Sequence, residues 1–286
     1  TGSLTVEKSD IQTRGSHFIV NGTGKEMAQA QVQLNHENIE GDSPLIIAGD
    51  VSVDSPAEAS WTLNNTFVSI NTYLGINTAT GSRASGIDAA LKMNSSRLTV
   101  GQDLTMADAA TVLLDNQSEL TIGGNIQLGS NQTINKGSWI TVSNSSQLSA
   151  VNLKVDAGTT VEIEKNSTVT LTGSLTNYGS ISMDYSSSLE FNDVDEIGSI
   201  TVDMAGAAES GVYKLIDYTG AATGISYDTI TLNNNTYNYT ARTINNDLYL
   251  VRLDGTKEYY VNSEWSSSAP FEEVTFGDDG KAYYGI

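Results

Sequence analysis

The sequence contains no cysteine, two histidines and three prolines among its 286 residues. Without cysteine, the chain can form no disulfide, iron–sulfur cluster or thiolate zinc site, and it has no cysteine nucleophile. Its 14 Lys and Arg are outnumbered by 34 Asp and Glu, which gives a formal net charge of −20. So few cations leave no basic surface for a phosphate backbone, and we therefore expect no nucleic-acid partner.

Long apolar runs are also absent, since the longest are of strand length, as at Leu45–Ala48. A membrane helix needs roughly 20 apolar residues, so we expect no transmembrane segment in this chain. The N-terminus shows no charged and then apolar leader, so any signal peptide is expected to have been removed or to lie outside this sequence. Hydrophobic residues still make up 38% of the chain, enough to fill a core, which argues against disorder. The composition, rich in Thr, Ser and Asn, is typical of a soluble, secreted chain.

An internal repeat dominates the middle of the chain. Apolar and polar residues alternate in short segments, which are separated by polar pairs such as Asn144-Ser145 and Lys165-Asn166. One inward apolar position recurs at intervals of 22, 28, 21 and 20 residues: Leu98, Leu120, Leu148, Val169 and Leu189. A second series stands eight residues ahead of it: Val112, Ile140, Val161 and Ile181. The pattern predicts short strands and polar corners in coils of about 20 residues.

Two all-β architectures give short strands at regular spacing. A meander of hairpins favours Asn-Gly or Asp-Gly turns, and neither dipeptide stands in the regular stretch. Similarity at coil length instead favours a right-handed, single-stranded parallel β-helix, a solenoid in which each strand stacks on its counterpart one coil later. Asn at the corners tolerates left-handed backbone angles and bonds to the neighbouring main chain. Each coil should rise about 4.8 Å.

Three regions are expected along the chain. Residues 1–205 should form the parallel β-helix, with irregular coils at the N-terminal end. Residues 206–255 should form a C-terminal cap of aromatic-rich antiparallel strands, within 211–220, 228–235, 236–240 and 247–253. A cap is needed because an open last coil would template edge-to-edge association. Residues 256–286 are interpreted as the start of a following repeat unit or a linker.

A family resemblance lies in the C-terminal part. The motif Gly211-x-Tyr213-x-Leu215-Ile216-x-Tyr218-x-Gly220, followed by Asp247-Leu-Tyr-Leu, resembles the C-terminal part of bacterial autotransporter passenger domains. Residues 259–265 and 274–285 resemble the start of the repeat in AIDA-type adhesins. The resemblance implies a non-enzymatic segment of a larger cell-surface or secreted protein, attached to the outer membrane through regions outside this chain. Its implied partners are host or environmental glycans or proteins.

Parallel β-helices also serve as polysaccharide lyases and glycoside hydrolases, which is the alternative function. Hydrolysis needs converging carboxylates, and Asp193 and Asp195, next to Glu196, form the best local cluster. We expect these to be solvated outward positions, so no catalytic residue is predicted. A lyase needs a cationic base, but the cations of the regular coils share no repeat phase: Lys92, Arg97, Lys136, Lys154 and Lys165. A third interpretation is a spacer without a ligand.

No metal site or cofactor is predicted. His17 and His36 share no metal-ligand spacing. Asp278-Asp279-Gly280, and Asp42 near Asp50, offer oxygen ligands for calcium, but neither matches a known calcium loop, so tight turns are expected. The sequence has no phosphate-binding loop, nucleotide fingerprint or Gly-x-Ser-x-Gly elbow.

Exposed aromatic rings are the expected contacts for carbohydrate, because rings stack on sugar faces. The predicted ligand-binding residues are Trp61, Tyr73, Trp139 and Tyr178. Trp139 precedes the inward Ile140, so alternation places its ring on the outside. Further available rings are those of Tyr185, Tyr227, Tyr259 and Tyr260. The sequence does not name the ligand, and it leaves open whether the chain self-associates along its side or end.

Overall fold

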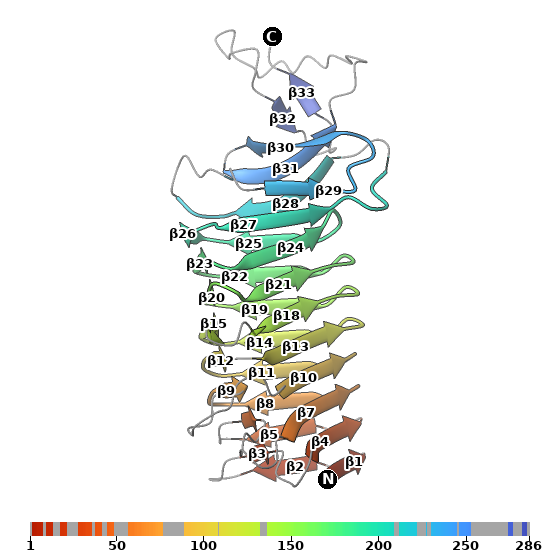
Figure 1. Cartoon of the computed structure of the whole chain (residues 1–286), viewed down its shortest axis with the longest axis vertical. Coiled ribbons are helices and arrows are strands. Elements are labelled where there is room, and N and C mark those ends of the chain that lie inside the picture. The colour runs from red at the N-terminus through yellow and green to blue at the C-terminus, as the bar shows by residue number, and fades with distance from the viewer. Residues whose placement is uncertain are drawn as a thin grey trace.

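The computed structural model is an elongated stack of β-strands (Figure 1). It describes residues 2–7, 10–13, 18–21, 28–35, 38–41, 45–48, 57–76, 89–107, 109–131, 136–208, 212–221, 227, 230–244, 246–252, 274–276 and 282–284. Side chains are described between residues 60 and 251 of these ranges, apart from 130–136 and 244. Every regular element in the described ranges is a strand, so the all-β prediction is confirmed.

Three long sheets contain most of the strands. Sheet A has ten strands: β1 (Gly2–Glu7), β4 (Ala28–Asn35), β7 (Ala57–Asn64), β10 (Ala89–Asn94), β13 (Ala110–Asp115), β18 (Trp139–Val142), β21 (Thr160–Ile163), β24 (Ser180–Asp184), β27 (Ser199–Asp203) and β29 (Ile230–Asn233). Sheet B has eleven: β2 (Asp10–Thr13), β5 (Asn38–Gly41), β8 (Phe67–Ile70), β11 (Arg97–Val100), β14 (Glu119–Ile122), β19 (Gln147–Ala150), β22 (Thr168–Leu171), β25 (Ser188–Phe191), β28 (Val212–Tyr218), β31 (Asp247–Arg252) and β30 (Tyr239–Ile244). Sheet C has eight: β3 (Phe18–Asn21), β6 (Leu45–Ala48), β9 (Leu74–Ile76), β12 (Leu104–Met106), β15 (Asn125–Leu128), β20 (Asn152–Val155), β23 (Ser174–Asn177) and β26 (Asp193–Glu196).

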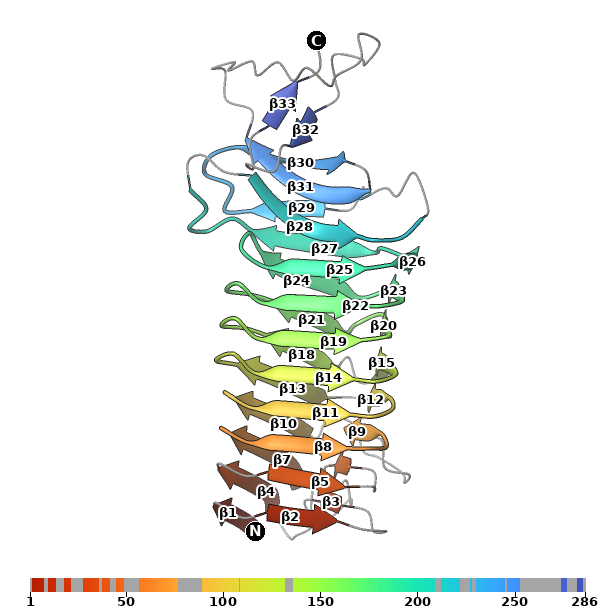
Figure 2. The same ribbon diagram turned by 180° about the vertical axis from the view of Figure 1, so that it is seen from behind.

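The chain supplies strands to sheets A, B and C in rotation, so that sheet neighbours belong to successive passes of the chain. We call three successive strands, one from each sheet, a rung. Sheets A and C are parallel throughout, and sheet B is parallel as far as β28. Figures 1 and 2 show the rungs stacked along the long axis of the molecule. The A–B, B–C and C–A corners are the segments that join one sheet to the next.

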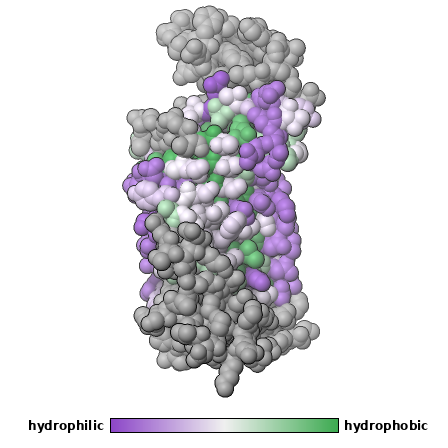
Figure 3. Space-filling model, in the orientation of Figure 1, coloured by the Kyte–Doolittle hydropathy of each residue, from purple (hydrophilic) through white to green (hydrophobic). Residues whose placement is uncertain are grey.

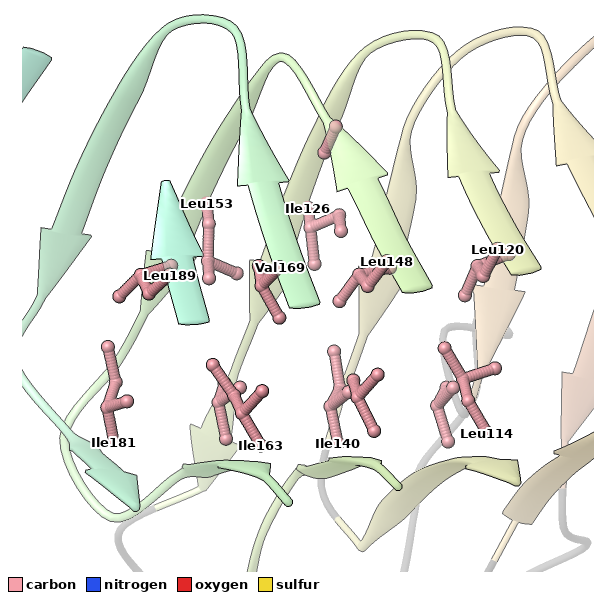
Figure 4. Close-up of a cluster of buried hydrophobic side chains, with 14 of the residues drawn as sticks. Leu114, Leu120, Ile126, Ile140, Leu148, Leu153, Ile163, Val169, Ile181 and Leu189 are labelled. Atoms are coloured by element: carbon pink, nitrogen blue, oxygen red, sulfur yellow. The ribbon is translucent and has the colours of Figure 1, made fainter. Parts of the chain in front are cut away.

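The interior is formed by columns of apolar side chains, one from each rung. Sheet B aligns Leu98, Leu120, Leu148, Val169 and Leu189, and all five are buried. Sheet A likewise aligns Val112, Ile140, Val161 and Ile181. Figure 4 shows members of these columns lying one behind another between the sheets. Both predicted series are therefore confirmed residue by residue, because inward side chains of parallel strands in register must stack on one another.

The structure has a third strand in each rung, which the two-segment repeat did not predict. Sheet C aligns Leu104 with Ile126 and Leu153, and all three side chains are buried. Glycine permits the sharp B–C corner that leads into these strands. A Cβ atom at Gly123 would lie 2.5 Å from the Gly101 carbonyl oxygen of the preceding rung, so the backbones approach more closely there than a side chain allows.

The C-terminal end combines parallel and antiparallel pairing. Strand β28 is parallel to β25 but antiparallel to β31, and β31 is antiparallel to β30. The prediction of an antiparallel strand within 228–235 is wrong, because β29 extends sheet A in parallel. Its Ile230 and Leu232 align with Ile200 and Val202, and so they prolong the inward apolar columns. Within 256–286, the structure describes only β32 (Val274–Phe276) and β33 (Ala282–Tyr284), which form an antiparallel pair, so the prediction for that region is not tested.

Candidate functional site

The A–B corners repeat one backbone conformation along the regular rungs. Two residues with positive φ stand together at Asn116-Gln117 (52° and 63°), Asn144-Ser145 (54° and 62°) and Lys165-Asn166 (55° and 61°). Single residues with positive φ occur at the equivalent Asn65 and Ser95. The predicted left-handed corners are thereby confirmed, since Asn is among the few side chains that visit this region readily.

A ladder of buried hydroxyl groups lies directly after these pairs. The backbone N–H of each ladder residue except the last, Ser187, donates to the hydroxyl oxygen one rung further on, at N···O distances of 3.0, 3.2, 3.1, 3.2 and 3.4 Å. The hydroxyl groups donate to nearby carbonyl oxygens, as Ser118 does to Asp115 at 2.6 Å. The ladder consists of Thr66, Ser96, Ser118, Ser146, Ser167 and Ser187. It supplies each buried amide with an acceptor, which a sharp corner could not otherwise obtain from the sheet.

A shallow polar groove of about 460 Å³ runs along the outside of four successive A–B corners. Its lining contains amides, hydroxyls and one ammonium, which together supply many donors and acceptors. The groove is lined by Ser95, Asn116, Gln117, Asn144, Ser145, Lys165 and Asn166. Figure 3 shows a hydrophilic band along the flank where the strands of sheet A end. This is the kind of surface that can exchange hydrogen bonds with a hydroxyl-rich ligand.

Carboxylates border the groove at the ends of the sheet A strands. Asp184 accepts hydrogen bonds from the Lys165 N–H (2.6 Å) and the Ser187 hydroxyl (2.7 Å). Asp115 accepts from the amide side chain of Asn144 and from the Asn116 N–H. These short carboxylates therefore act as corner caps. For the longer Glu164, burial and the neighbouring carboxylates, Glu162 first, raise the pKa above its ordinary value of 4.5, although Lys165 lowers it in part.

The triplet Asn-x-Ser/Thr, an acceptor motif for N-glycosylation in secreted proteins, recurs at the same corners. It occurs at Asn64-Asn65-Thr66, Asn94-Ser95-Ser96, Asn116-Gln117-Ser118 and Asn144-Ser145-Ser146. In each triplet the third residue is a buried member of the hydroxyl ladder, and the others lie at the strand end and in the left-handed turn. The fold therefore accounts for these four triplets without any modification.

The C–A corners are built differently in each rung. Buried polar residues of three types stand there, namely Ser138, Thr159 and Asn177. The Asn177 amide donates to the Ile197 carbonyl oxygen (2.7 Å), while its oxygen accepts from the N–H two residues further on. A short antiparallel pair, β16 (Ser130–Asn131) and β17 (Lys136–Gly137), is inserted before Ser138. The C–A corners therefore share no single arrangement of side chains.

Two of the predicted ligand-binding rings lie beside the C–A corner. Trp139 is the first residue of β18 and is 42% exposed, so its predicted outward position is confirmed. Its indole N–H donates to Glu162 Oε2 at 3.2 Å, and the Thr141 hydroxyl donates to the same oxygen at 3.2 Å. Tyr178, in the corner before β24, is 57% exposed. A ligand role for either ring stays a prediction.

The other predicted rings lie elsewhere. Tyr73 is 38% exposed but stands in a B–C corner, so the structure does not bring it to Trp139. The prediction of Trp61 as an exposed ring is wrong, because its side chain is 2% exposed and its Cα pairs with that of the inward Leu91. Tyr227 is also buried. Tyr185 is half-buried and packs edge-on against Tyr213, with ring centroids 5.0 Å apart.

One exposed ring was missed. Phe67 begins β8 and is 53% exposed, and the Arg97 guanidinium lies 5.8 Å from its ring centroid. Arg97 also pairs with Glu119 at 2.6 Å. The signal was present in the sequence, because Phe67 precedes the inward Val68 just as Trp139 precedes Ile140.

The acidic cluster considered for catalysis does not converge with its neighbours. Asp193 and Asp195 are exposed on β26 in sheet C, whereas Asp184 lies in sheet A and Glu190 in sheet B. Asp195 accepts a hydrogen bond from the Thr176 hydroxyl at 3.0 Å. Because the three sheets face different directions, these carboxylates do not surround a common point.

A cluster of charged side chains connects the antiparallel strands β28 and β31 at the C-terminal end of sheet B. Lys214 on β28 lies 2.8 Å from Asp247 and 2.9 Å from Asp217. Burial opposes its charge, but hydrogen bonds to the two carboxylates outweigh burial and raise the pKa of Lys214. Asp247 also accepts from the Tyr218 N–H at 2.8 Å. These contacts join β31 to β28, so the cluster is structural.

Several predicted positions lie outside the described residues: His17, His36, Asp42, Asp50, Tyr259, Tyr260, Asp278, Asp279 and Gly280. Among the residues that are described, no group of three or more His, Asp or Glu could hold a metal ion. The described part of the chain also contains no helix long and apolar enough to cross a membrane. Comparison with protein-family models, curated proteins and solved structures finds no match to this chain.

Proposed function

We propose that this chain is a segment of a right-handed parallel β-helix in a large bacterial autotransporter-like or adhesin-like protein, displayed outside the cell. Two observations support the architecture. Strands enter three parallel sheets in rotation, and inward residues align rung after rung. Crossovers between parallel strands are nearly always right-handed. The resemblance of the C-terminal motif to autotransporter passenger domains supports the cell-surface location, with attachment through regions outside this chain.

The proposed role is non-enzymatic adhesion to host or environmental glycans or proteins, with hydroxyl-rich glycans as the favoured class. The polar groove along four successive A–B corners carries this proposal. Each corner offers only a few amide, hydroxyl or ammonium groups, so a single contact is weak. Polar groups of this kind recur at four successive corners, and linked weak contacts reinforce one another through effective concentration.

The groove can be tested with the triple variant Gln117→Gly, Ser145→Gly and Lys165→Gly. All three residues have positive φ, which glycine adopts without strain, so the variant should fold while losing its groove side chains. We expect glycan-array signals of the purified chain to fall about tenfold or more, since several contacts are lost together. The matched control is Thr99→Ala, Thr121→Ala and Thr170→Ala on the outer face of sheet B.

Equal binding by the groove variant and the wild-type chain would contradict a role for the groove. Release of reducing ends or unsaturated products, abolished by Asp193→Asn or Asp195→Asn, would instead establish the polysaccharide-active alternative. Blank arrays, together with unchanged cell attachment after deletion of the segment, would establish a spacer.

A further inference from the structure

The indole of Trp139 is a fixed apolar surface on a polar face of the molecule. Its N–H is bound to Glu162 one rung further on, and the Thr141 hydroxyl holds the same carboxylate oxygen. The ring is therefore held across two rungs while 42% of the residue stays exposed. An aromatic ring that is oriented before binding loses little conformational freedom when a ligand stacks on it.

Hydrogen-bonding groups surround this ring. Thr160 and Ser180 follow Trp139 in register along sheet A, and both are partly exposed. Glu162 is also partly exposed, and its carboxylate has acceptor sites beyond those that Trp139 and Thr141 occupy. An apolar ring bordered by hydroxyls and a carboxylate matches a pyranose, which has an apolar face and a rim of hydroxyl groups.

A second exposed ring stands further along the same corner. Tyr178 lies two residues before Ser180, and Ser180 is two rungs from Trp139 in register. Two rungs correspond to about 10 Å at the strand spacing of a sheet, which matches the separation of the first and third sugars of a chain and exceeds that of the two sugars in a disaccharide. A chain of sugars that follows the long axis could therefore contact both rings.

We propose that Trp139 and Tyr178 form a binding site for a neutral glycan chain that lies along the C–A corner. This inference rests on the proposed glycan-binding function and names a second site, separate from the A–B groove. The negative charge next to the Trp139 ring favours neutral glycans over anionic ones. The carboxylate of Glu162 contacts the ring itself, so a polyuronate or sulfated chain is repelled.

The experiment measures affinity by calorimetry for neutral hexasaccharides (β-1,4-glucan, β-1,4-mannan and α-1,4-galactan), the corresponding disaccharides, and hexagalacturonate. The wild-type chain should bind at least one neutral hexasaccharide and should bind hexagalacturonate much more weakly. Trp139→Ala should weaken neutral binding by roughly tenfold, as expected when an aromatic anchor is truncated. Tyr178→Ala should weaken the hexasaccharide but leave the disaccharide unchanged, because only the longer ligand reaches the second ring.

Two further variants separate the ring from its surroundings. Phe67→Ala removes an exposed ring from sheet B and should leave the affinity for every glycan unchanged. Glu162→Gln keeps an acceptor for the indole N–H but removes the charge, so binding of hexagalacturonate should rise several-fold while neutral binding is retained.

Three outcomes would overturn the inference. If Trp139→Ala binds neutral glycans as the wild type does, this site is wrong, although the proposed function stands. If hexagalacturonate binds as tightly as its neutral galactan counterpart, the ligand class is wrong. If the wild-type chain binds no glycan of any kind, the proposed function fails and this inference fails with it.

Discussion

The C–A and A–B corners stand at the start and at the end of the sheet A strands, yet they are built in different ways. Four successive A–B corners, at residues 95, 116–117, 144–145 and 165–166, use a left-handed turn followed by a buried hydroxyl that accepts from an N–H of the preceding rung. The C–A corners use Ser138, Thr159 or Asn177 and accommodate an inserted strand pair. The A–B corner is therefore a repeated structural element, whereas the C–A corner differs in structure from rung to rung.

The two kinds of corner differ in how freely their residues can change between rungs. At the A–B corner each hydroxyl serves the neighbouring rung, so a changed residue leaves a partner amide unsatisfied. At the C–A corner Trp139 and Tyr178 project outward without interrupting such a chain of hydrogen bonds. The repeated A–B corners favour many similar weak contacts with a ligand. The variable C–A corners can instead present one distinctive pair of aromatic rings.

The largest expected effect comes from breaking the hydroxyl ladder. Ser146→Ala removes the acceptor of the buried Ser118 N–H, which now donates to Ser146 Oγ at 3.1 Å. An unsatisfied buried donor costs roughly 1–3 kcal/mol, so the free energy of unfolding should fall by about that amount. Urea unfolding measures the change, and an unaltered dependence on urea concentration would show that the native fold is retained.

The control lies at the start of β24, beside the C–A corner. Ser180 is a partly exposed residue of the outer face of sheet A, so Ser180→Ala should change the unfolding free energy by no more than about 0.5 kcal/mol. Equal effects of the two serine substitutions would show that the hydroxyl ladder contributes no more to stability than an outward serine does.

Much of this architecture could be predicted from the sequence, because the inward columns must repeat at coil length. The two apolar series were found for that reason, and so were the left-handed corners. The hydroxyl ladder was missed although its signal was available. A serine stands two residues before each of Leu98, Leu120, Leu148, Val169 and Leu189. Composition does not distinguish a buried serine from an exposed one. Only the constant spacing from the inward apolar residue indicates that these serines are buried.

The candidate sites were less predictable, and the errors have a physical pattern. Trp61 was expected to be exposed, yet it shares the inward phase of Leu63, and alternation alone would have placed it in the core. The bond between Trp139 and Glu162 joins residues 23 apart in sequence. This hydrogen bond depends on the register of β18 and β21. In the sequence, register was inferred from the inward apolar positions only, so contacts between outward polar residues were not predicted.

A smaller effect, with opposite signs in two regions, is expected from glycine. Ser145 has a φ of 62°, a conformation that costs an L-residue roughly 1–2 kcal/mol, so Ser145→Gly should stabilise the chain by up to about 1 kcal/mol. Thr141 is in the extended strand β18, where glycine is less favourable by roughly 0.5–1 kcal/mol. Thermal unfolding of both variants should therefore show shifts in opposite directions. Two shifts of the same sign would contradict the assigned corner conformation.

The smallest expected effect concerns Glu164, which occupies the corner position that Asp115 and Asp184 fill in other rungs. Both aspartates accept hydrogen bonds from corner N–H groups. Glu164 instead has a raised pKa, caused first by burial and then by the charges of Glu162, Asp184 and Asp203. A raised pKa in the folded state means that folding favours the protonated form. The stability linked to this group is therefore fully present below its ordinary pKa of 4.5 and is lost as the pH rises through the raised value.

Glu164→Gln should consequently raise the melting temperature slightly at pH 7, where the wild-type chain carries an unfavourable carboxylate. The difference should vanish below pH 4.5, where both side chains are neutral, and it should shrink in 1 M salt because screening weakens the repulsion. Glu119→Gln is the matched control, since Glu119 is paired with Arg97 and its loss should give no such gain. A gain that persists at acidic pH would trace the effect to packing instead of charge, whereas a loss of stability at pH 7 would show that Glu164 caps its corner as Asp115 and Asp184 do.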